Sequence, residues 1–177
     1  QIREHSHNLV VEIHNLRHET VIGDSLRMKQ IFLNILSNAI KYTPDGGEIK
    51  LYFTEKPSPQ KNIKCFEFSC ADNGFGISPE AQKELFQPFM RSSSEQTAHI
   101  QGTGLGMSIT KSIVEVMGGT IDVETELGKG TEFIVKVDFP IVDEPEEVEE
   151  EKSAAAQEID FSKIKLLLVE DNEVNRE

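Results

Sequence analysis

Two side-chain amides and an amine recur at helical spacing in residues 30–42, a segment that is otherwise mostly apolar. On a helix that turns about 100° per residue, Asn34, Asn38 and Lys41 fall within an arc of about 60°. The Asn38 carbonyl could coordinate Mg²⁺, which prefers oxygen ligands, and the Lys41 ammonium could offset phosphate charge. Alternatively, both amides could bond to neighbouring backbone groups, and this face alone does not decide between the two uses.

A glycine series, Gly102-x-Gly104-x-Gly106, stands in front of a second predicted helix. Glycines let backbone N–H groups approach a phosphate, and the N-terminal end of a helix carries partial positive charge. The series lacks the Gly-Lys-Ser/Thr of a Walker loop, and no strand precedes it as in a dinucleotide-binding fingerprint. It is therefore a weak signal by itself, to which Arg91 could add positive charge.

Asp72 follows a predicted strand and precedes Gly74 and Gly76. At such a strand end the backbone can approach a flat ligand, and a carboxylate can accept a hydrogen bond from an exocyclic amine. This chemistry favours adenine, which carries an amino donor at N6, over guanine, which presents an acceptor there. The alternative is an aspartate that only stabilises a tight turn.

The periodicity of the apolar residues predicts the elements that position these groups. The long helix is capped by Asp24 or Ser25, and a shorter one begins at Ser78 and Pro79 and runs into residues 85–89. Residues 90–101 are polar and predict a mobile lid, and residues 107–117 predict a third helix. Strands are predicted at residues 7–13, 48–53, 63–70, 120–125 and 131–139, with a hairpin joining the second and third.

The net charge of −13 is unevenly distributed, because nine acids and one lysine lie in residues 142–160. The acidity argues against a nucleic-acid surface or direct contact with an anionic membrane. The composition of residues 142–162 predicts a disordered linker, and residues 163–169 predict a buried strand that ends at Glu170 and Asp171.

Five segments together resemble the N, G1, F, G2 and G3 boxes of sensor histidine kinases of the GHKL superfamily, in that family's order and spacing. They are residues 34–44 (NILSNAIKYTP), 72–77 (DNGFGI), 86–89 (FQPF), 102–109 (GTGLGMSI) and 128–133 (GKGTEF). Five matched boxes over roughly residues 8–139 make a strong signal.

The resemblance implies the Bergerat ATP-binding fold, an α/β two-layer sandwich in which a mixed sheet packs on helices, with ATP and Mg²⁺ as cofactors. In it Asn38 would coordinate Mg²⁺, Asn34 would support the site and Asp72 would bind the adenine amino group. Phe86 and Phe89 would anchor the lid, and Thr131 would lie near adenine. The remaining residues implied to bind the nucleotide are Lys41, Tyr42, Gly74, Gly76, Ile77, Arg91, Gly102, Thr103, Gly104, Leu105 and Gly106.

One departure separates the chain from the ATPases of the wider superfamily, which place a water-activating Glu where this chain has Asn34. An amide takes no proton near neutrality, so the resemblance favours transfer of the γ-phosphoryl group to a histidine over hydrolysis. The phosphoacceptor histidine itself is expected elsewhere, because His18 precedes an acid but lies in a predicted turn or strand. The alternatives are a GHKL-type ATPase and a degenerate nucleotide-binding module without transfer activity.

The implied organisation is a catalytic domain at residues 1–141, an acidic linker at 142–162 and the truncated start of a receiver domain at 163–177. In a complete receiver, Glu170 and Asp171 would form its Mg²⁺ pair. The expected partners are the dimerisation and phosphoacceptor helices and the receiver domain of a homodimeric hybrid kinase, whereas this fragment is expected to be a monomer. It is expected in the cytoplasm, as part of a membrane-anchored bacterial sensor.

Overall fold

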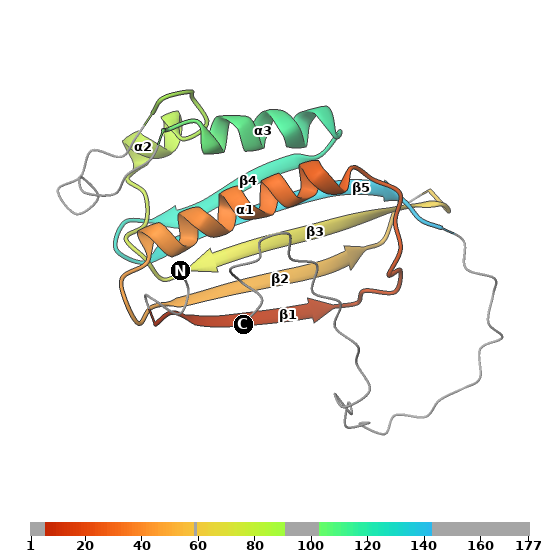
Figure 1. Ribbon diagram of the computed structural model, residues 1–177, viewed down its shortest axis with the longest axis horizontal. Helices are drawn as coiled ribbons and strands as arrows, with labels where there is room; N and C mark the ends of the chain where they lie inside the picture. The colour runs from red at the N-terminus through yellow and green to blue at the C-terminus, as the bar shows by residue number, and fades with distance from the viewer. Residues whose placement is uncertain (1–5, 59, 91–102, 143–177) are drawn as a thin grey trace, which may run out of the picture. The chain divides into compact units, whose positions relative to one another are not determined.

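The computed structural model describes residues 6–58, 60–90 and 103–142, and in these ranges the chain forms one mixed sheet and three helices (Figure 1). The predicted lid, linker and receiver strand lie outside these residues, as do Arg91, Gly102, Glu170 and Asp171. The elements are β1 (Asn8–His14), α1 (Ser25–Tyr42), β2 (Glu48–Lys56), β3 (Ile63–Asp72), α2 (Pro79–Glu84), α3 (Gly106–Val116), β4 (Thr120–Glu126) and β5 (Gly130–Pro140).

The ends of helix α1 are set by a capping aspartate at its start and by a proline that follows its last turn. The Asp24 carboxylate accepts a hydrogen bond from the Arg27 N–H at 3.0 Å, which confirms Asp24 as the N-cap. The helix stops at Thr43, whose backbone is extended because Pro44 disfavours helical geometry in the residue before it. Between these ends Ile31, Ile35 and Ala39 form the buried stripe of α1.

The sheet has the strand order β1-β2-β3-β5-β4, in which only the β1–β2 pair is parallel. Strand register aligns Leu51 with Cys70 and Cys70 with Phe133, so alternate residues of neighbouring strands share one apolar face. That face forms a single core with α1 and with Val114 of α3. Helix α3 contacts both α1 and β4, and the two helices lie on the same side of the sheet (Figure 1). The result is the predicted two-layer α/β sandwich.

The predicted helix at Ser78 starts as expected but ends earlier. The Ser78 hydroxyl accepts a hydrogen bond from the Ala81 N–H, and Pro79 occupies the first turn. The prediction that the helix continues to residues 85–89 was wrong, because α2 ends at Glu84. Beyond it the chain forms tighter turns, in which the Gln87 N–H donates to the Glu84 carbonyl, and Pro88 cannot continue a helix.

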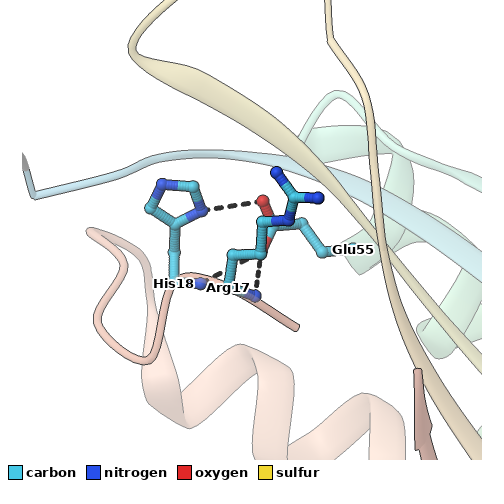
Figure 2. Close-up of polar contacts among 3 residues, drawn as sticks. All are labelled: Arg17, His18 and Glu55. Carbon is cyan, nitrogen blue, oxygen red and sulfur yellow. Dashed lines mark hydrogen bonds and ion pairs between the residues drawn. The ribbon is translucent and has the colours of Figure 1, made fainter. Parts of the chain in front are cut away.

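The connection between β1 and α1 is tied to the sheet by Glu55 (Figure 2). One Glu55 carboxylate oxygen accepts the backbone N–H groups of Arg17 and His18 at 2.7 and 3.0 Å, and the other lies 2.7 Å from His18 Nδ1. The Glu55 side chain is only 6% exposed. Burial alone would raise the pKa of Glu55, but these three hydrogen bonds outweigh it and hold the pKa below its ordinary value. His18 lies outside any helix, as predicted.

No helix in the three described ranges is long and apolar enough to cross a membrane.

Replacing Glu55 by Gln tests this connection. We expect the free energy of unfolding at pH 7 to fall by about 1–3 kcal/mol, because a neutral amide replaces the charged acceptor of two backbone N–H groups, and its NH₂ group can bond to His18 Nδ1 only if that nitrogen carries no proton. Because the pKa of Glu55 is lowered in the folded protein, ionised Glu55 stabilises the fold at pH values above its ordinary pKa of 4.5. This stabilisation is lost as pH falls through the pKa of the folded state, so the difference in stability between wild type and variant should shrink in acid. Urea unfolding at pH 7 and pH 4 measures both effects.

The matched control is Glu48→Gln, an exposed acid on the same strand that is paired with Lys50 at 2.8 Å. Exposed pairs contribute about 0–1 kcal/mol, so this variant should change stability little. Equal losses in the two variants would contradict a special contribution from Glu55.

Candidate functional site

Two of the predicted nucleotide-binding residues, Asp72 and Thr131, meet at one end of the sheet. Asp72 is the last residue of β3, and it pairs with Ile49 of β2 and with Thr131 of β5. Because these positions share a face with Leu51, Cys70 and the other core residues, the Asp72 side chain is on the helix-facing side.

Asp72 is a substantially buried carboxylate with few partners. Its Oδ1 accepts the Gly74 N–H at 2.9 Å, and the Thr131 backbone provides a further hydrogen bond. Burial raises the pKa of Asp72 from 3.8 to about 6, because these hydrogen bonds only partly offset the loss of solvent. A carboxylate held in this way keeps acceptor capacity for another donor.

The loop after Asp72 packs between α1 and the β4–β5 hairpin. Its Phe75 N–H donates to the Tyr42 carbonyl at 3.1 Å, and its Phe75 carbonyl accepts the Gly128 N–H at 2.7 Å. A Cβ at Gly74 would lie 2.2 Å from the Tyr42 carbonyl oxygen, and one at Gly76, where φ is +67°, would lie 2.0 Å from the Glu126 carbonyl oxygen. Both glycines were predicted to let a base approach, and the structure adds that the protein's own backbone excludes any side chain there.

Two threonine hydroxyls extend this site along the hairpin. Thr125 Oγ1 accepts the Ile77 N–H at 2.9 Å and lies 3.0 Å from Thr131 Oγ1. Thr125 was not predicted as a site residue. The only sequence signal for it is that a turn at residues 127–129 pairs Thr125 with Thr131, which puts both hydroxyls on the face of Asp72.

The polar face of α1 divides into residues with different surroundings. Asn34 Nδ2 donates to Thr110 Oγ1 at 3.1 Å and to the Gly106 carbonyl at 3.3 Å, so this amide bridges α1 and α3. Asn38 is half-buried, and its side chain forms no hydrogen bond within the described ranges. Lys41 is exposed in the last turn of α1. The NH₂ group of Asn34 is therefore engaged, whereas no described residue engages the Asn38 amide.

The start of α3 presents unused backbone donors. The N-cap residue Leu105 makes no side-chain capping bond, and among the described residues the Thr103 hydroxyl accepts only the Leu105 N–H, at 3.4 Å. Gly104 has a φ of +70°, and its carbonyl accepts the Phe89 N–H at 3.0 Å, so the residues that flank 91–102 are joined. The first N–H groups of α3 are left for an anion.

The two phenylalanines of the F box are held differently. Phe86 is half-buried against the core, and the Lys111 ammonium lies 5.2 Å from its ring centroid. Phe89 is 73% exposed and adopts a φ of 65°, so its backbone, and not its ring, makes the contact with Gly104. Among the described residues, the ring of Phe86 packs against the core and that of Phe89 does not.

No group of three or more His, Cys, Asp or Glu side chains in the described part of the chain could hold a metal ion. A single neutral carbonyl such as that of Asn38 does fit an ion whose other ligands are waters and phosphate oxygens.

Comparison with known proteins identifies relatives that share this arrangement. Residues 23–141 match the family model described as histidine kinase-, DNA gyrase B- and HSP90-like ATPase. The autoinducer 2 sensor kinase/phosphatase LuxQ of Vibrio vulnificus (strain YJ016) is 34% identical over 155 residues, which are 86% of this chain and 18% of LuxQ. The chain thus spans about a fifth of the length of this curated relative.

Solved structures agree with the sequence match. The mycobacterial sensor histidine kinase MprB has a TM-score of 0.62 and 28% identity, covering 80% of this chain and 88% of that one. Full-length ShkA, solved in complex with AMPPNP, has a TM-score of 0.61 and 29% identity, covering 79% of this chain and 27% of that one. The predicted resemblance and fold are confirmed, and the chain belongs to the family of histidine kinase-, DNA gyrase B- and HSP90-like ATPases, within which it resembles the catalytic domains of sensor histidine kinases.

Proposed function

We propose that this chain binds Mg-ATP and presents the γ-phosphoryl group to a histidine on a separate dimerisation and phosphoacceptor domain. The observation that carries this proposal is Asp72, a half-buried acceptor with a pKa of about 6 at the point where β3, the glycine loop and the β4–β5 hairpin meet. A perturbed acid in such a position is characteristic of a functional site. ShkA, a structural neighbour, was solved with the ATP analogue AMPPNP.

In this proposal the base binds at Asp72. The carboxylate accepts a hydrogen bond from the adenine amino group, and the Thr131 hydroxyl lies beside it through the Asp72–Thr131 register pair. Tyr42 and Ile77 border the same loop, since Phe75 bonds to the Tyr42 carbonyl and Ile77 to Thr125.

The phosphates lie between the helices. The uncapped N–H groups of α3, with Gly104 and Gly106, receive phosphate oxygens, and Lys41 adds positive charge from α1. Asn38 supplies its free carbonyl to Mg²⁺, which when bound would offset charge on the phosphates. Thr103, Leu105 and, beyond the described residues, Arg91 and Gly102 would complete this part of the site.

Catalysis would then consist of positioning and charge stabilisation, because the nucleophile is a histidine of another domain. The ATPase alternative requires a base that activates water. The Asn34 amide cannot act as one, and its NH₂ group is already engaged with Thr110 and Gly106. We assign the chain to the catalytic domain of a cytoplasmic hybrid kinase, with residues 142–162 as linker and 163–177 as the start of a receiver.

Asp72→Asn tests the adenine contact. Calorimetric titration with ATP and GTP, each with and without Mg²⁺, should show adenine-selective, Mg-enhanced binding by the wild-type chain. The variant should lose at least about tenfold in ATP affinity, because its amide no longer offers a charged acceptor to the N6 amine. Asp122→Asn on the exposed face of β4 is the control. GTP binding as tight as ATP binding in the wild type would argue against the assignment.

The same variant should be more stable than the wild type. Because the pKa of Asp72 is raised in the folded protein, the free energy of unfolding falls by about 2–3 kcal/mol as pH rises from about 4 to about 6. Above that range it stays at the lower value. Asn removes this ionisation while its oxygen can still accept the Gly74 N–H. Thermal or urea unfolding should therefore show a gain at pH 8 that vanishes near pH 4, and a loss at pH 8 would show that Asp72 is a structural acid.

Asn38→Ala tests the metal contact. Removing the carbonyl should weaken ATP binding about tenfold in the presence of Mg²⁺ and much less in EDTA, because only the metal-bound form uses this ligand. Ser37→Ala, on the neighbouring position of α1, serves as control. Equal losses with and without Mg²⁺ would exclude Asn38 as a ligand.

A further inference from the structure

Thr110 is a polar residue on the buried face of α3. It is 0% exposed, and its neighbours on that face, Met107, Ile113 and Val114, are core residues. Its hydroxyl donates to the Gly106 carbonyl at 2.9 Å and accepts from Asn34 Nδ2 at 3.1 Å, while the same Nδ2 donates to the Gly106 carbonyl at 3.3 Å. Each of these three hydrogen bonds has a donor facing an acceptor, and the Thr110 hydroxyl both donates and accepts.

The network connects the two helices that flank the phosphates in the proposed function. Gly106 ends the glycine loop and is the first residue of α3, and a Cβ built there would lie 4.0 Å from Asn34 Cγ. Asn38 and Lys41 follow Asn34 by about one and two turns on the same face of α1. The separation between the N–H groups of α3 and these two side chains is therefore set at the Asn34–Thr110 contact.

We propose that Thr110 is a positioning residue for the nucleotide's phosphates, which acts through Asn34 and Gly106 and does not touch the ligand. This inference rests on the proposed function, and it assigns Asn34 to the same network and not to the metal. Phosphate recognition depends on this network because an anion must contact α1 and α3 together. The base, in contrast, is held by Asp72 on the sheet.

Thr110→Val is the decisive variant, since valine has nearly the shape of threonine and lacks only the hydroxyl. Thr110→Ser restores the hydroxyl. Ser112→Ala is the matched control, because the Ser112 hydroxyl donates to the Ser108 carbonyl four residues back at 3.0 Å but is exposed. Ser112→Ala therefore removes a hydroxyl bond of the same kind within α3 but no contact with α1.

The full chain and its variants are titrated with Mg-ATP and with adenosine, which lacks phosphates. Thr110→Val should bind Mg-ATP about tenfold more weakly and adenosine as the wild type does, and Thr110→Ser and Ser112→Ala should bind both normally. Amide exchange should accelerate in residues 106–109 of Thr110→Val, because the hydroxyl that ties this turn to α1 is gone.

The outcomes of these titrations distinguish a failure of the positioning role from a failure of the proposed function. A wild-type chain that binds neither ligand overturns the proposed function and the positioning role with it. Normal Mg-ATP binding by Thr110→Val, or equal losses for Mg-ATP and adenosine, overturns the positioning role alone and leaves the proposed function in place.

Discussion

The packing of α1 against the sheet is the constraint on which the site depends. Ile31, Ile35 and Ala39 must face the apolar side of the sheet, and this fixes the rotation of the helix about its axis. With that rotation set, Asn34 and Asn38 project to one flank, where Asn34 meets α3. A change of register in α1 would move the core stripe and the polar face together, so stability and site geometry cannot vary independently.

Two carboxylates on the helix-facing side of the sheet, one buried and one half-buried, differ in how far the protein compensates their charge. Glu55 accepts two backbone N–H groups and a histidine, and its pKa is lowered. Asp72 has weaker support, and burial raises its pKa to about 6. Both acids lose solvent, but only Glu55 has its charge fully compensated by the protein. The charge of Asp72 is therefore only partly compensated by the protein, at some cost to the fold, and in the proposed function a ligand supplies the missing donor.

The sequence predicted those features that depend on local chemistry. Asp24 and Ser78 cap helices because their side chains reach an N–H three residues on, and Asp72, Gly74 and Gly76 are recognisable from one short segment. The strands were predicted in place and type, with ends shifted by one to three residues. The placement of β5 between β3 and β4 could not be derived, because strand order depends on pairing between distant segments.

Residues whose partners are distant in sequence were beyond prediction for the same reason. Thr125 and Thr110 have ordinary positions in a strand and a helix, and only the assembled hairpin and helix pair give their hydroxyls a role. Glu55 looks like a charged residue of a solvated strand, yet it is buried because a loop 37 residues earlier in the chain supplies its donors. The boxes therefore give the candidate site, whereas the contacts among its residues depend on tertiary structure.

Asn34 shows that a catalytic base and an interhelical contact are competing uses of one position. Its NH₂ group faces two oxygens, the Gly106 carbonyl and the Thr110 hydroxyl. An ionised glutamate there has only acceptors, so it would repel the Gly106 carbonyl and could bond to Thr110 only if that hydroxyl turned away from Gly106. Either change would release the first turn of α3 from α1. A chain of this fold that uses a base at position 34 must therefore hold its phosphate loop by other contacts, whereas this chain has the contact and forgoes the base.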